Sequence, residues 1–137
     1  PKKDHFLSYK NCTLFKPNLK ELKEGLKMDV NPQDSQSIQS ALASLQQALD
    51  SKMNMVTLSE HGIAIWDGAD LFQEPAHVRK IVDVSGAGDS VIAVASLALA
   101  SGASKDEIAQ LSNLAGGLVC ERVGVVPITR DMLYKEI

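Results

Sequence analysis

The chain of 137 residues is poor in aromatic side chains, which make up 4% of it, and it has no long apolar run. Its longest apolar stretch, residues 91–100, is about half of what a membrane-spanning helix requires. The net charge of −3 gives no reason to invoke a nucleic acid or an acidic membrane. Composition therefore favours a globular domain with neither kind of partner.

Cysteine is scarce as well, since only Cys12 and Cys120 occur and they lie far apart. There is no Cys-x-x-Cys pair, and the three histidines are scattered, which argues against a disulfide framework or a zinc site. No signal peptide opens the chain. We expect free thiols in a reducing compartment and a cytoplasmic protein.

Charge is distributed unevenly. Residues 1–27 contain seven lysines against three acidic residues, a net charge of +4, and the remainder carries −7. A solvated helix face explains such a lysine cluster better than a docking patch does.

Apolar periodicity alternates between strand and helix spacing, which predicts an α/β fold with a mainly parallel sheet and helices on its faces. Residues 86–100 are apolar nearly all round, so we expect that helix to be central and covered. Ser104 and Glu107 form a capping box, and Gly25 with basic residues closes the first helix. The predicted strands cover residues 12–15, 53–58, 62–66 and 78–84, and the predicted helices cover residues 19–26, 38–49, 86–100, 104–118 and 129–137.

The glycine-rich segment 83–89 is the most informative motif. Two glycines leave backbone N–H groups unobstructed where a helix begins, and such a position suits a phosphate. A carboxylate in this position, Asp89, suggests phosphoryl transfer in which Asp89 accepts the proton of the attacking hydroxyl. The alternative, a tight turn capped by Ser85 or Asp89, remains open.

Two other phosphate-binding motifs are excluded. No Gly-x-x-x-x-Gly-Lys-Ser/Thr sequence occurs. A dinucleotide fingerprint needs a small residue where Val91 stands, and it needs a strand ending in an acidic residue about 20 positions later. Asp106 has that spacing but follows a predicted helix.

The segment 83–89 resembles the C-terminal signature of the ribokinase-like (PfkB) carbohydrate kinases, Asp-Thr/Val-x-Gly-Ala-Gly-Asp. Segments 16–21, 57–62 and 113–117 agree with the same family. Together they look most like the heptose 7-phosphate kinase domain of the heptose kinase/ADP-heptose synthase group, although Val126-Pro127 departs from that group's usual ending. The resemblance implies a three-layer ribokinase-like fold.

The beginning of the chain, Pro1 to Asp4, resembles a point in the middle of such a kinase. The resemblance thus implies that residues 1–137 are a single partial domain, the C-terminal nucleotide-binding half. The half that supplies most acceptor-binding residues would lie upstream. We therefore expect the chain by itself to be inactive.

A second candidate site spans residues 18–21. From the residues alone, Asn18 is a natural N-cap and Glu21 completes a capping arrangement. The resemblance places this Asn-x-x-Glu, with Leu19 and Lys20, against the ATP triphosphate and its Mg²⁺. Glu21 would act on the ion through water. Capping and binding can both hold.

Two further segments are candidate nucleotide contacts. Thr57 to Gly62 ends a buried strand in a turn, a usual ligand position in α/β sheets. By similarity Thr57, Ser59 and Gly62 would line the phosphates or ribose, although many relatives have glycine where Ser59 stands. Asn113 and Gly117 share one helix face and resemble the adenine-side helix. Helix packing is the alternative for Gly116 and Gly117.

The resemblance completes a mechanism. MgATP would lie across Gly86 to Asp89, and an anion hole formed by Gly86, Ala87 and Gly88, with the Asp89 N–H, would hold the phosphoryl oxygens. Asp89 would act as the base toward the anomeric hydroxyl of a heptose 7-phosphate, giving a 1,7-bisphosphate. Many relatives also use a monovalent cation such as K⁺ near the backbone of Asp83 and Ser85.

The sequence leaves the acceptor and the class of function open. The acceptor could be that of a ribokinase, fructokinase or nucleoside kinase, because the acceptor-binding half is not represented. A non-catalytic nucleotide-binding module is an alternative from another class. The sequence leaves the oligomeric state open, although unpaired apolar edges would favour a homo-oligomer.

Overall fold

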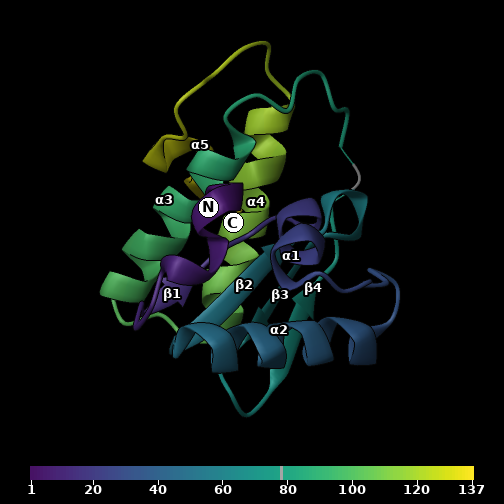
Figure 1. Ribbon diagram of the computed structural model, residues 1–137. Coiled ribbons are helices and arrows are strands. Elements are labelled where there is room, and N and C mark those ends of the chain that lie inside the picture. The colour runs from purple at the N-terminus through teal and green to yellow at the C-terminus, as the bar shows by residue number, and fades with distance from the viewer. Residues whose placement is uncertain (78) are drawn as a thin grey trace. The chain divides into compact units, whose positions relative to one another are not determined.

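The computed structural model spans residues 1–137 and describes all of them except Val78. The chain forms two compact units, Pro1–Pro75 and Ala76–Ile137, which are coloured purple to teal and teal to yellow in Figure 1.

The first unit is built on a four-stranded sheet with the order β1-β2-β3-β4. The strands are β1 (Leu14–Phe15), β2 (Met53–Thr57), β3 (Ile63–Trp66) and β4 (Leu71–Glu74). Only β1 and β2 are parallel, and the other two pairs are antiparallel. The prediction of a mainly parallel sheet is wrong for these strands. Short connections over residues 58–62 and 67–70 cannot form the crossover that parallel neighbours require.

Two strand predictions differ from the structure. Strand β4 was not predicted, although Asp67 marks its turn by accepting from the N–H groups of Ala69 and Asp70, both at 2.9 Å. Conversely, the described part of the expected strand 78–84 is not a strand, and Val78 lies outside the described residues. The N–H groups of Val82 and Asp83 donate instead to Cys120 O at the end of a helix.

Helices α1 (Leu19–Leu26) and α2 (Ser35–Leu49) pack on the sheet of the first unit, and α2 runs across β2 and β3 in Figure 1. The helical periodicity from Ile38 onward is confirmed. Asp34 caps α2 by accepting from the Gln36 N–H at 3.0 Å. The apolar stripe of α2 is fully buried at Ile38, Ala41, Leu42, Leu45 and Leu49.

Gly25 has a different role from the one predicted. Helix α1 ends at Leu26, and the next residue, Lys27, caps it by adopting the left-handed conformation and donating its N–H to Lys23 O. Gly25 lies inside the helix, and a Cβ there would overlap the Phe6 ring. Phe6 belongs to the short 3₁₀ helix η1 (Lys3–Ser8) and also meets Phe15 edge to face at 5.3 Å. The absence of a side chain at Gly25 therefore leaves the space in which the Phe6 ring packs.

The second unit consists of α3 (Ala87–Ala100), α4 (Lys105–Cys120) and α5 (Arg130–Tyr134). The predicted capping box is confirmed at α4, where the Ser104 N–H donates to Glu107 at 2.8 Å and the Glu107 N–H donates to Ser104 at 3.3 Å. Helices α3 and α4 pack along each other. A Cβ at Gly116 would lie 2.9 Å from Val91 Cγ2, so this glycine permits close helix packing.

The prediction that α3 is central and covered is wrong for the structure as described. Val91, Val94, Ala95 and Ala98 are buried, but Leu97 is 70% exposed. Helix α4 covers only one side of α3 within its unit, so an all-round apolar helix keeps an open face.

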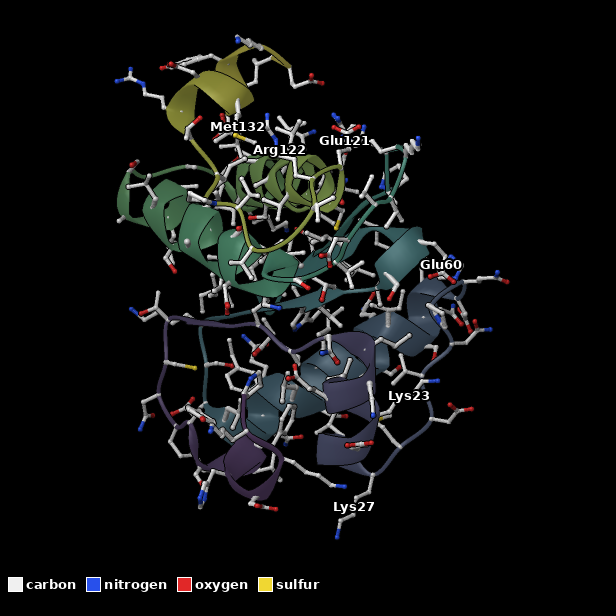
Figure 2. All side chains as sticks on the ribbon, turned by 90° about the horizontal axis from the view of Figure 1, so that it is seen from above. Lys23, Lys27, Glu60, Glu121, Arg122 and Met132 are labelled. Atoms are coloured by element: carbon white, nitrogen blue, oxygen red, sulfur yellow. The ribbon has the colours of Figure 1, made fainter. Side chains whose placement is uncertain are left out.

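Lysine side chains near the N-terminus lie on the surface of the first unit. Lys23 and Lys27 of α1 project outward in Figure 2. Lys23 pairs with Asp29 at 3.3 Å and Lys3 pairs with Glu24 at 3.8 Å. These contacts are those of a solvated face. None of the helices described is both long and apolar enough to cross a membrane.

Candidate phosphate-binding loop and associated residues

The turn into α3 holds the candidate anion hole. Gly86 precedes the helix with a φ of 75°, a conformation that favours glycine. The Ala87 N–H donates to Val84 O at 3.2 Å, and the Ser90 N–H donates to Gly86 O at 3.0 Å. Between them, the N–H groups of Gly88 and Asp89 have no acceptor in the described part of the chain. These two amides at the positive end of a helix are therefore open to an anion, whereas Ala87 is engaged in its own turn.

Asp89 lies in the first turn of α3, and its side chain is exposed. Across the residues that the structure describes, its carboxylate has neither a hydrogen-bond partner nor an ion-pair partner. A side chain that merely capped the helix would be bonded to a backbone amide. Asp89 is thus accessible to an incoming hydroxyl, as a general base must be.

Asp83 holds the loop together, a role that the sequence reasoning missed. Its Oδ1 accepts from the Ser85 N–H at 2.9 Å and from Ser85 Oγ at 2.7 Å, and its Oδ2 accepts from the Gly124 N–H at 2.9 Å. These hydrogen bonds, first those from Ser85, lower the pKa of Asp83. The Asp-x-Ser spacing was a usable signal, because aspartate commonly bonds the amide two residues later.

The lowered pKa of Asp83 predicts how the loop responds to pH. The stabilising bonds are complete above the ordinary aspartate pKa of about 3.9, and they are lost as pH falls through the lower, folded-state value. Amide NMR resonances of Ser85 and Gly124 should therefore titrate with a midpoint below about 3.9. Asp83→Asn should remove this transition, and a midpoint at or above the ordinary value would contradict the assignment.

Gly86 is also close-packed. A Cβ there would lie 3.0 Å from Val125 Cγ1. Together with the Asp83–Gly124 bond, this contact joins the loop before α3 to the turn that follows α4.

In the first unit, the residues of the second candidate site form a complete capping box. The Asn18 N–H donates to Glu21 Oε2 and the Glu21 N–H donates to Asn18 Oδ1, both at 2.8 Å. The Thr57 N–H donates to Pro17 O at 3.2 Å, and Asn18 bridges to Thr57. Asn18, Glu21 and Thr57 are therefore brought to one end of β1 and β2.

The neighbouring candidates have simple surroundings. Lys20 is exposed, whereas Leu19 packs against the core. Ser59 begins the short 3₁₀ helix η2 (Ser59–His61) with a φ of 54°, a conformation that favours glycine. This explains physically why glycine is suited to that position. The N–H of Gly62 closes the turn on Ser59 O at 3.2 Å.

Asn113 and Gly117 share one face of α4. Asn113 is 9% exposed and has an interaction of its own. The space beside Gly117 is filled by Arg79, whose Cδ and Nε lie 3.0 and 3.1 Å from where a Cβ would be. A nucleotide base could approach Gly117 only if Arg79 moved. The assignment of Asn113 to base binding stays a prediction.

No group of three or more His, Cys, Asp or Glu side chains suited to a metal ion is found among the described residues. The residues present can still serve a magnesium ion carried by a phosphate ligand. One oxygen of Glu21 is already bonded in the capping box, so a contact through water suits it better than direct ligation.

Known proteins resemble almost the whole chain. Residues 2–131 match the pfkB family carbohydrate kinases. The bifunctional protein HldE of Aliarcobacter butzleri is 36% identical over 135 residues, which cover 98% of this chain and 28% of that protein. HldE of Campylobacter fetus is 38% identical over 124 residues, 90% of this chain and 26% of that protein. The chain thus spans little more than a quarter of these relatives.

Solved structures agree on the fold. Phosphofructokinase-2 from Escherichia coli superposes with a TM-score of 0.84 at 25% identity, over 95% of this chain and 41% of that one. Ribokinase from Thermotoga maritima gives a TM-score of 0.77 at 20% identity, over 98% of this chain and 44% of that one. The ribokinase-like fold is therefore confirmed. With the family match over residues 2–131, the chain belongs to the pfkB family of carbohydrate kinases.

Proposed function

We propose that the chain is the C-terminal, nucleotide-binding half of an ATP-dependent kinase that phosphorylates the anomeric hydroxyl of a heptose 7-phosphate to give a heptose 1,7-bisphosphate. The observation that carries the proposal is the exposed, unpartnered Asp89 carboxylate beside the open N–H groups of Gly88 and Asp89. The similarity to HldE proteins supports the heptose acceptor.

The proposed reaction uses the loop as follows. The N–H groups of Gly88 and Asp89 hold the oxygens of the transferred phosphoryl group, where their partial positive charge counters the negative charge of the transition state. Ala87 contributes only if its bond to Val84 opens. The Asp89 carboxylate accepts the proton of the sugar hydroxyl as the oxygen attacks the γ-phosphorus and the bond to ADP breaks.

The assignments of the nucleotide and ion contacts belong to the same proposal. The candidate contacts with ATP are Asn18, Leu19, Lys20, Glu21, Thr57, Ser59, Gly62 and Asn113, and Glu21 acts on Mg²⁺ through water. Gly117 is not among them, because Arg79 fills the space beside it. Both carboxylate oxygens of Asp83 already accept hydrogen bonds within the loop. A K⁺ ion would therefore be coordinated by the backbone oxygens of Asp83 and Ser85. A potassium complex is known for phosphofructokinase-2 of Escherichia coli.

The proposal is tested by measuring ADP release from MgATP by the complete protein with a panel of acceptors. We expect heptose 7-phosphate to be turned over with the highest kcat/KM, against ribose, fructose, fructose 6-phosphate and a nucleoside. Preference for another sugar would keep the kinase and overturn the heptose assignment. ATP binding without turnover of any acceptor would favour a non-catalytic nucleotide-binding module.

Assembly is a separate part of the proposal. A tetrameric inhibited form is known for phosphofructokinase-2. Ile81, Val84 and Leu97 are exposed apolar side chains in this chain, and exposed apolar surface favours association. Light scattering of the complete protein would show whether it forms a homo-oligomer.

A further inference from the structure

Arg79 occupies an unusual position for a charged side chain. Its Nη1 donates to Glu121 at 3.2 Å and its Nη2 donates to Glu136 at 3.0 Å, while only 14% of the side chain is exposed. Glu121 follows the last residue of α4 and is labelled in Figure 2, and Glu136 lies just after α5. One guanidinium thus ties three segments of the second unit together.

The side chain of Arg79 packs against Gly117 of α4. Its Cδ and Nε lie over Gly117, where an added Cβ would be 3.0 and 3.1 Å from them, closer than an ordinary van der Waals contact. Its buried Nε has no hydrogen-bond partner among the residues that the structure describes. A planar, permanently charged group held by two carboxylates over a glycine is fixed more tightly than an exposed ion pair, which is usually worth little.

The segment that follows Arg79 has few other attachments. It is not part of a sheet, and the side chains of Ile81, Val82 and Val84 are exposed. Its backbone is held where Val82 and Asp83 donate to Cys120 O. One of its side chains, that of Asp83, accepts a hydrogen bond from the Gly124 N–H. These contacts lead to the end of α4 and the turn after it, and Glu121, one of the two partners of Arg79, also lies at the end of α4.

We propose that Arg79 is a positioning residue for phosphoryl transfer: bridged to Glu121 and Glu136 over Gly117, it fixes the segment that presents Gly88 and Asp89. The inference rests on the proposed function of that loop. Arg79 touches no reacting atom in this account and acts through the segment 80–85. Loss of the bridge would let the loop shift, and a shift of about 1 Å at reacting groups can lower a rate about 10²-fold.

The test compares Arg79→Met, Arg79→Lys and Glu136→Gln in the complete protein. Arg122→Met is the matched control, because Arg122 is an exposed arginine next to Glu121 with no side-chain bond among the described residues. Three quantities are measured: kcat, KM for ATP, and hydrogen–deuterium exchange of the peptide that contains residues 85–89.

We expect Arg79→Met to lower kcat by about 10- to 100-fold, to change KM for ATP by a smaller factor, and to accelerate exchange at residues 85–89. Arg79→Lys should recover part of the loss, because lysine keeps the positive charge but lacks the planar guanidinium that can bond two carboxylates at once. Glu136→Gln should show a smaller effect in the same direction, and Arg122→Met should show none.

Unchanged kcat and unchanged exchange in Arg79→Met would overturn the inference. A lower melting temperature with normal kcat would also overturn it, because Arg79 would then be only structural. Should Arg79→Met fail to fold, Glu136→Gln decides the matter, since Glu136 is 40% exposed and its replacement leaves the core intact. If the unaltered protein phosphorylates no sugar, the proposed function fails, whereas the exchange measurement still tests the positioning.

Discussion

Replacing Asp89 with Asn in the complete protein should lower kcat for sugar phosphorylation by about 10²–10⁴-fold, the usual contribution of a general base. Asparagine keeps the size of the side chain but cannot accept the hydroxyl proton. The N–H groups of Gly88 and of residue 89 stay in place, so the phosphates keep their donors. Affinity for ATP, measured by calorimetry, should be unchanged or higher, because a negative charge beside the phosphates is removed.

Asp106→Asn is a matched control for this substitution. Asp106 is an exposed aspartate in the first turn of α4, so its replacement makes the same change of charge in the first turn of another helix. We expect kcat to stay at the level of the unaltered protein. Near-normal kcat in Asp89→Asn, or an equal loss in both variants, would show that Asp89 is not the base.

Gly25→Ala should destabilise the chain by about 2–3 kcal/mol, although alanine normally stabilises a helix relative to glycine by about 0.5–1 kcal/mol. The reason is the Phe6 ring, which occupies the space that the new methyl group would need. Phe6 is only 3% exposed, so the ring has to leave a buried site or push α1 away. Urea unfolding followed by the fluorescence of Trp66, the single tryptophan, would measure the effect.

The Phe6→Ala background distinguishes this explanation from a general intolerance of position 25. There the ring is absent, and Gly25→Ala should become neutral or stabilising by up to about 1 kcal/mol. Glu24→Ala, at an exposed neighbouring position of α1, should change stability little. An equal cost of Gly25→Ala in both backgrounds would show that the Phe6 contact is not the cause.

Local signals predicted most helices of this fold. Helix α1 begins and ends at the predicted residues, and the capping box of Asn18 and Glu21 specifies its start. Ser104 and Glu107 did the same for α4. The resemblance at residues 83–89 led to the family, which the family match and the solved structures confirm.

Features that depend on distant partners were not predictable in the same way. The antiparallel direction of β3 is not one of them, because the connection over residues 58–62 is too short for a parallel crossover. The backbone of residues 82 and 83, by contrast, bonds to Cys120 at the end of α4, a partner that the sequence does not indicate. Gly117 seemed to leave room for a base, but Arg79, 38 positions earlier, fills that space. The hydrogen bond that Asp83 accepts from the nearby Ser85 N–H could have been predicted from the sequence. The hydrogen bond that Asp83 accepts from the distant Gly124 N–H could not.

We propose that this family member transfers the γ-phosphate of ATP to a sugar hydroxyl at the loop that carries Asp89. The most direct measurement is the ³¹P NMR spectrum of the complete protein incubated with MgATP and heptose 7-phosphate. We predict a new resonance of a phosphate on the anomeric oxygen, appearing in equal amount with ADP and absent with Asp89→Asn. ADP that accumulates with free phosphate and no sugar bisphosphate, or an Asp89→Asn protein that makes the product at the normal rate, would contradict the account.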